Sequence, residues 1–210
     1  MKLIQRLTLI VCFMLLCGTT FSAAQTQSEV DRIVSLGKQA ERQYDYASAS
    51  RLYRIAAGFG NAESAFRLYV MCRYDYVPNS DNEWLEWLKR AGDLGDDEAN
   101  YKYCLIILKG GRSSRSDHYS CEERIEKLAK KGHRQGMVLY GDYLMTYDTK
   151  EKAMVWYKKA AAKGEVYGAL NAGYYSSNKV EQRNYYNQAL RINPRSAKEF
   201  FAQKHVMFKP

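Results

Sequence analysis

The sequence predicts an all-α protein, an α/α superhelix (solenoid) of stacked antiparallel helix pairs with about eleven helices. Three observations support this fold class. A glycine-anchored pattern of bulky and small residues occurs four times, strand-like alternation is nowhere sustained, and Pro78 and Pro194 fall between the proposed helices. Since proline ends or kinks a helix, that placement agrees with the proposed boundaries.

The repeat is anchored on four glycines that each follow a helical stretch containing alanine: Gly60, Gly95, Gly132 and Gly164. A bulky residue precedes each glycine by seven or eight positions, small residues precede it by three or four, and another small residue follows it by four. In the last copy these positions hold Trp156-Tyr157, Ala160-Ala161 and Gly168. Four copies at similar spacing indicate repeated structural units.

The pattern within each copy predicts a helix, a tight turn and a second helix. Bulky and small residues three or four positions apart lie on one face of a helix, so an aromatic ring can fill the space beside an alanine. The glycine tolerates the left-handed conformation that commonly ends a helix. Because one helix pair cannot bury its apolar face alone, neighbouring pairs must stack.

The segments around the repeats fit the same plan. Ile33, Leu36 and Ala40 have helical spacing, and they predict an N-terminal capping helix over residues 25–43. The repeat domain is expected over 44–203 and a C-terminal tail over 204–210. A basic, Gly- and Ser-rich segment, residues 110–117, interrupts the repeat and is expected to be a loop.

The first 24 residues have the three-part layout of a secretory signal peptide. Lys2 and Arg6 precede an uncharged run over residues 7–16, and small residues follow, which predicts cleavage between Ala24 and Gln25. The apolar run is shorter than the roughly 18 to 20 residues needed to span a bilayer. We therefore expect an exported protein, periplasmic or secreted, with a lipoprotein attached through Cys17 as the alternative.

The charge balance favours acidic partners. The whole chain has a formal net charge of +9 at pH 7, and Lys2 and Arg6 would leave with the signal peptide. A positive balance attracts acidic proteins or anionic surfaces, but we expect no nucleic-acid partner, because an exported protein rarely meets any.

Residues suited to catalysis or metal binding are sparse. His118, His133 and His205 are far apart, without cysteine or carboxylate partners at metal-ligand spacing. We therefore predict no catalytic residues, metal site or cofactor. Three cysteines follow the signal peptide, and either one disulfide or three buried thiols is compatible with their number: Cys72, Cys104 and Cys121.

One charged pattern recurs with the repeat, five or six positions before each glycine. We call these residues the basic column: Arg54, Lys89, Arg90, Lys127, Lys158 and Lys159. Stacking brings equivalent positions of successive repeats into register. We hypothesise that the column contacts an acidic segment of a partner protein, and the alternative is a solvated charged face.

The sequence from Tyr157 to Gly164, preceded by residues 152–156, closely resembles the Sel-one-like (Sel1-like) repeat, a relative of the tetratricopeptide repeat (TPR). Leu139-Tyr140-Gly141 and Asn171-Ala172-Gly173 are similar to that family's second-helix signature. The resemblance implies a right-handed superhelix of helix pairs and a role in scaffolding or adaptor binding.

The expected function is therefore a non-enzymatic scaffold or adaptor that binds protein. One alternative is a cell-envelope glycan (peptidoglycan) binder, because tyrosine rings stack on sugars, although Tyr53, Tyr157 and Tyr174 occupy expected packing positions. The resemblance also implies a β-lactamase-like alternative among exported, cysteine-rich members. The three cysteines here lack the regular pairing of those members.

Overall fold

The computed structural model describes residues 26–80, 82–110 and 115–206. The proposed signal peptide, with Cys17, Ala24 and Gln25, lies outside the described residues, as do residues 111–114 of the expected loop and 207–210 of the expected tail. The described residues form eleven helices and no strand, which confirms the all-α fold class. They divide into two compact units, one ending at Asp96 and the other beginning at Asp97.

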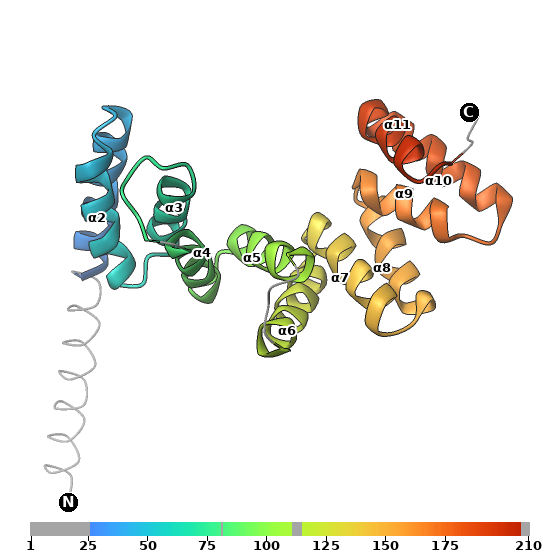
Figure 1. The fold of residues 1–210 in the computed structure, drawn as a ribbon, viewed down its shortest axis with the longest axis horizontal. Helices are drawn as coiled ribbons and strands as arrows, with labels where there is room; N and C mark the ends of the chain where they lie inside the picture. The colour runs from blue at the N-terminus through green and yellow to red at the C-terminus, as the bar shows by residue number, and fades with distance from the viewer. Residues whose placement is uncertain (1–25, 81, 111–114, 207–210) are drawn as a thin grey trace, which may run out of the picture. The chain divides into compact units, whose positions relative to one another are not determined.

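Unit 1 contains four helices, coloured blue to green in Figure 1. They are a helix over residues 26–42, α2 (Tyr46–Gly58), α3 (Ala62–Arg73) and α4 (Glu83–Asp93). Helix α3 packs against both α2 and α4. Val30 and Val34 of the first helix form a buried cluster with Ala56 of α2, so the N-terminal helix covers the first repeat.

Unit 2 contains seven helices, coloured green to red in Figure 1. They are α5 (Asp97–Lys109), α6 (Arg115–Lys131), α7 (Arg134–Tyr147), α8 (Lys150–Ala162), α9 (Val166–Tyr175), α10 (Lys179–Ile192) and α11 (Pro194–Gln203). Each helix packs against the next one along the chain. Contacts also join α5 to α7, α7 to α9 and α9 to α11, so these alternate helices form one layer.

The four anchoring glycines lie in turns between helices, as expected. All have positive φ angles, from 77° at Gly164 to 101° at Gly95. Side-chain caps start helices that follow these turns: Asn61 accepts a hydrogen bond from the backbone N–H of Ser64 at 2.8 Å, and His133 accepts one from Gly136 at 3.0 Å. These caps satisfy amide groups that a helix start leaves without partners.

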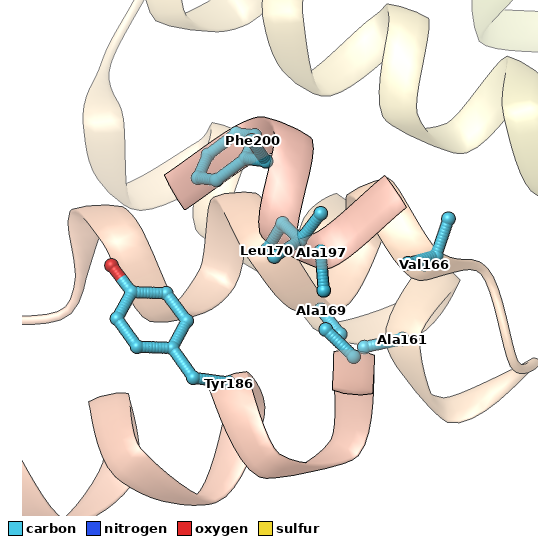
Figure 2. Close-up of a cluster of buried hydrophobic side chains, with 8 residues drawn as sticks. Ala161, Val166, Ala169, Leu170, Tyr186, Ala197 and Phe200 are labelled. Carbon is cyan, nitrogen blue, oxygen red and sulfur yellow. The ribbon is translucent and has the colours of Figure 1, made fainter. Parts of the chain in front are cut away.

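The core uses the bulky and small positions of the repeat. The residues seven positions before the glycines are at most 1% exposed: Tyr53, Leu88, Ile125 and Tyr157. The Tyr157 ring lies against Gly141, where an added Cβ would be only 2.5 Å from Cε1 of the ring. Figure 2 shows the buried cluster of the last repeats, which includes Tyr186 and Phe200.

Two details differ from the sequence-based expectations. Helix α6 begins at Arg115, so the last three residues of the expected loop are helical. Asp117 lies in the first turn, where its negative charge interacts favourably with the helix dipole. Tyr174 is 37% exposed and is therefore only partly buried, although its ring packs against Tyr175 and Phe200.

The three cysteines of the described residues, Cys72, Cys104 and Cys121, are buried free thiols. Cys104 Sγ lies 3.8 Å from the carbonyl oxygen of Cys121 and donates to it, which joins α5 to α6. Within the described residues, no helix is both long enough and apolar enough to cross a membrane.

Candidate functional site

The basic column in unit 1 is largely engaged in contacts within the unit. Arg54 forms an ion pair with Glu83 at 2.7 Å and lies over the Trp87 ring. Arg90 also lies over Trp87 and donates a hydrogen bond to the carbonyl oxygen of Ala57 at 2.9 Å. The indole N–H of Trp87 and the Arg54 guanidinium both lower the pKa of Glu83, and the indole has the larger effect. These two arginines therefore join α2 to α4.

The column residues of unit 2 divide in the same way. Lys158 forms an ion pair with Glu181 at 2.6 Å and so joins α8 to α10. Lys159 Nζ lies 4.2 Å from the centre of the Trp156 ring. Lys127 is exposed in α6, and like Lys89 of unit 1 it has no partner among the described residues. Four of the six column residues thus have structural contacts.

Unit 2 contains a groove of about 600 Å³ among the described residues. The layer formed by α5, α7, α9 and α11 provides most of its lining, with Tyr157 of α8. The lining residues are Tyr101, Leu105, Lys109, Gln135, Val138, Leu139, Asp142, Met145, Thr146, Tyr157, Glu165, Tyr167, Asn171, Tyr175, Phe200, Gln203 and Lys204. Successive repeats therefore contribute neighbouring parts of one continuous surface.

Asp142 is the carboxylate around which the groove's polar groups are arranged. Its Oδ1 accepts hydrogen bonds from the Tyr157 hydroxyl at 2.9 Å and from the Asn171 amide at 3.2 Å. These partners come from α8 and α9, so Asp142 joins three successive helices. It follows Gly141, whose lack of a side chain lets the Tyr157 ring approach α7. The close packing at Gly141 therefore places the Tyr157 hydroxyl within hydrogen-bond distance of Asp142.

The electrostatics of Asp142 reflect partial burial. Desolvation raises the pKa of Asp142, while the Tyr157 hydrogen bond and the positive charges of Lys109 and Lys204 act in the opposite direction. Desolvation, followed by the Asp142 charge, raises the pKa of Tyr157 and also that of Tyr175. Both phenols therefore stay protonated at neutral pH, and the Tyr157 hydroxyl is available as a donor to Asp142.

Aromatic side chains form a rigid part of the lining. The Tyr157 and Tyr175 rings stack with centroids 6.0 Å apart and planes at 11°. Tyr174 packs edge-on against both Tyr175 and Phe200, and Lys204 Nζ lies 5.6 Å from the centre of the Tyr174 ring. These contacts hold Lys204 beside the groove, and among the described residues it forms no ion pair with Asp142.

The groove can offer hydrogen bonds, apolar area and both signs of charge. The described residues contain no cluster of three His, Cys, Asp or Glu side chains that could hold a metal ion. His133 caps α7, where its Nδ1 accepts a hydrogen bond from the Gly136 backbone N–H at 3.0 Å. An arrangement of this kind suits reversible binding of a flexible ligand.

No pattern in the sequence predicted a role for Asp142 or for the two groove lysines, Lys109 and Lys204. Asn171 belongs to the segment that is similar to the family's second-helix signature, but no polar role was assigned to it. The available signal was Asp142 itself, a single carboxylate in the apolar run from Met137 to Met145. A charge at such a position requires a polar partner or a water-filled site.

Comparison with known proteins gives structural matches alone. No protein-family model matches the sequence, and no curated protein matches it. A protective antigen of uropathogenic Escherichia coli strains, described as displaying an SLR (Sel1-like repeat) fold, aligns with a TM-score of 0.67 and 20% identity, over 90% of this chain and 44% of that chain. The chain therefore spans less than half the length of that protein.

Two further solved structures agree with this match. A Sel1 repeat protein from Oxalobacter formigenes aligns with a TM-score of 0.62 and 18% identity, over 80% of this chain and 75% of that chain. A MamA protein aligns with a TM-score of 0.51 and 17% identity, over 86% and 98%. Identities this low establish the fold alone. The chain has the Sel1-like, TPR-like helical repeat fold.

Proposed function

We propose that this chain is a non-enzymatic protein-interaction module whose groove in unit 2 binds an extended segment of a partner protein. The layer of α5, α7, α9 and α11 supports this proposal, because it gives the groove contributions from successive repeats. Apolar and aromatic lining provides contact area, and a few convergent polar groups fix the orientation of a ligand.

The polar groups indicate the chemistry of the segment. Asp142 and Asn171 can bond to the N–H and C=O groups of an extended backbone. Lys109 and Lys204 favour a carboxylate in the same segment, while Phe200 and Met145 favour an apolar side chain. The preferred segment therefore combines an acidic residue with apolar residues, which agrees with the positive net charge of the chain.

Site-specific photo-crosslinking in the native cell tests this function. A photoreactive amino acid at Tyr167 of the groove is compared with the same amino acid at Val155, an exposed α8 residue outside the groove lining. We expect one protein to be captured from position 167 and not from position 155. Asn171→Ala and Lys204→Glu should each reduce that capture. Equal capture from both positions, or capture unaffected by both substitutions, would contradict the proposal.

Two residues of the basic column remain proposed contacts for a partner, Lys89 on unit 1 and Lys127 on unit 2, each by itself. Both are exposed and have no partner among the described residues. The other four residues contribute to packing between helices, and we assign them no direct role in partner binding.

We also propose that the protein is exported, to the periplasm or outside the cell. The three-part pattern of residues 1–24 supports export. Mass measurement of the mature N-terminus is the test: a chain beginning at Gln25 supports cleavage by signal peptidase. An acylated chain beginning at Cys17 would instead identify a lipoprotein, and an intact Met1 would contradict export by cleavage.

A further inference from the structure

Unit 1 has a cluster of four tyrosines, three exposed and one, Tyr46, half-buried, which we call the tyrosine patch: Tyr44, Tyr46, Tyr74 and Tyr76. The Tyr46 and Tyr76 rings stack with centroids 4.7 Å apart and planes at 10°. Tyr44 packs edge-on against Tyr46, and Tyr74 packs against Tyr76, each with centroids 6.3 Å apart. The start of α2 and the segment after α3 thus contribute two rings each, and the four rings form one continuous row.

The patch is unusually accessible for aromatic side chains. Tyr44 is 79% exposed, Tyr74 63% and Tyr76 49%. Burial in the repeat core therefore does not explain these residues, although it does explain Tyr53 and Tyr157. Exposed tyrosines that are held by their neighbours provide rigid contact area with little loss of side-chain entropy on binding.

One tyrosine of the patch, Tyr44, has an unfavourable backbone conformation. Tyr44 has a φ of 61° and Asp75, between Tyr74 and Tyr76, has a φ of 56°. Glycine occupies the left-handed position in the turns at Gly60 and Gly164. A bulky residue is disfavoured in this conformation. A tyrosine that is both strained and exposed does not primarily stabilise the turn.

Elsewhere in the described chain, arginine and lysine side chains lie over several aromatic rings. All three tryptophans, Trp84, Trp87 and Trp156, have an arginine or lysine over the ring at 4.2 to 5.6 Å. Tyr103 and Tyr174 are covered in the same way. No cation of the described residues lies over any of the four patch rings. The patch therefore presents π faces of the kind that cations occupy elsewhere in this chain.

The charged residues near the patch also favour a cation as its ligand. Asp45 and Asp75 are exposed and lie next to patch tyrosines in the sequence. Two nearby arginines have contacts of their own: Arg73 lies over Trp84, and Arg51 donates to the Ser48 hydroxyl while its charge also acts on Asp45. Carboxylates beside the negative faces of aromatic rings attract guanidinium and ammonium groups.

We propose that the tyrosine patch binds arginine or lysine side chains of a partner polypeptide. This surface is separate from the groove of unit 2 and selects the opposite charge. The positive net charge of the chain opposes non-specific attraction of a basic peptide, so measurable binding of such a peptide would require a local site.

The test uses the full chain and a fluorescently labelled 12-residue peptide with four arginines separated by glycine and serine. A matched peptide contains citrulline, which keeps the shape of arginine but has no charge. Fluorescence anisotropy at low ionic strength should show binding of the arginine peptide and much weaker binding of the citrulline peptide. An N-acetylglucosamine oligomer as competitor tests the glycan alternative, and we expect it to have no effect.

Tyr44→Gly separates binding from folding. Glycine tolerates the φ of 61°, so the thermal midpoint should stay the same or rise. Removal of each ring should weaken peptide binding roughly two- to five-fold. Tyr44→Gly/Tyr74→Ala/Tyr76→Ala together should weaken it about ten-fold or more. Tyr119→Ala, which removes a tyrosine that is 65% exposed in unit 2, should not change binding.

Four results would overturn the proposal. They are no binding of the arginine peptide to the full chain, equal binding of the citrulline peptide, unchanged binding by the folded triple variant, and displacement of the peptide by the sugar oligomer. If Tyr44→Gly lowers the thermal midpoint, Tyr74→Ala alone provides the binding measurement, because Tyr74 has a negative φ of −108°.

Discussion

At the scale of single residues, Asp142 shows how the groove combines stability with binding. Its carboxylate is partly desolvated, and two hydrogen bonds from Tyr157 and Asn171 compensate only in part, since its pKa remains above the ordinary value. A charge held in this way opposes folding slightly but strengthens hydrogen bonds from a ligand. Residues of this kind are common at functional sites.

We expect Asp142→Asn to raise the free energy of unfolding at pH 7 by up to about 1 kcal/mol, because the amide has no charge to desolvate and still accepts from Tyr157. Urea denaturation measures this change. Binding of the partner captured through the groove should weaken about ten-fold, because a charge-assisted hydrogen bond is lost. A variant that is less stable but binds equally well would assign Asp142 a purely structural role.

The pH dependence of this effect has a defined sign. The folded pKa of Asp142 lies above its unfolded value of about 3.9, so the folded state binds more protons between the two values. The contribution of Asp142 to stability therefore falls as pH rises from about 4 through the folded pKa. The stability difference between Asp142→Asn and the wild type should be near zero below pH 4, and it should be constant above the folded pKa of Asp142.

Gly141 provides a steric test beside the same carboxylate. Gly141→Ala would place a Cβ 2.5 Å from the Tyr157 ring, which is 1% exposed and has little room to move. We expect destabilisation of about 1 to 3 kcal/mol by chemical denaturation. Gly58→Ala is the matched helical control, with no atom within 4 Å of the added Cβ, and it should be neutral or stabilise by up to about 1 kcal/mol. Equal effects of the two changes would refute the packing role.

At the scale of helices and turns, the anchoring glycines are needed for backbone conformation. Gly164 has a φ of 77° and open space around an added Cβ. Gly164→Ala should therefore destabilise by about 1 kcal/mol through the backbone alone. Gly164→Asn should lose less, because asparagine tolerates this conformation. Thermal unfolding of the two variants compares them, and an alanine variant as stable as the wild type would show that the turn does not require glycine.

The helices and their core positions could be predicted because the repeat links local conformation to packing. Tyr157 and Gly164 lie on one helix and its turn, so their spacing alone indicates their roles. The groove could not be predicted in this way. The charge of Lys204 acts on Asp142 because α7 and α11 both pack against α9, and such proximity between residues 62 positions apart leaves no local pattern. The tyrosine patch was missed because exposed and buried tyrosines look alike in sequence.

At the scale of the whole molecule, the two units have different candidate surfaces. Unit 1 presents the tyrosine patch with its neighbouring carboxylates, and unit 2 presents the groove with Lys109 and Lys204. Each surface lies on a framework with its own buried core. A partner with both basic and acidic segments could therefore be recognised at two places, which increases its affinity through the effective concentration of the second contact.

The last prediction concerns the positive charge of the molecule. Lys89→Glu/Lys127→Glu reverses the charge of the two basic-column residues that have no partner among the described residues, while Arg54 and Lys158 keep their ion pairs. Lys150→Glu/Lys198→Glu makes the same change in net charge at two other exposed lysines. If the column contacts an acidic partner directly, the first pair should reduce capture of that partner more than the second pair does. High salt should diminish the difference, because exposed charges are screened within a few ångströms at about 1 M salt. Equal losses from both pairs would instead indicate that overall charge, and no particular surface, attracts the partner.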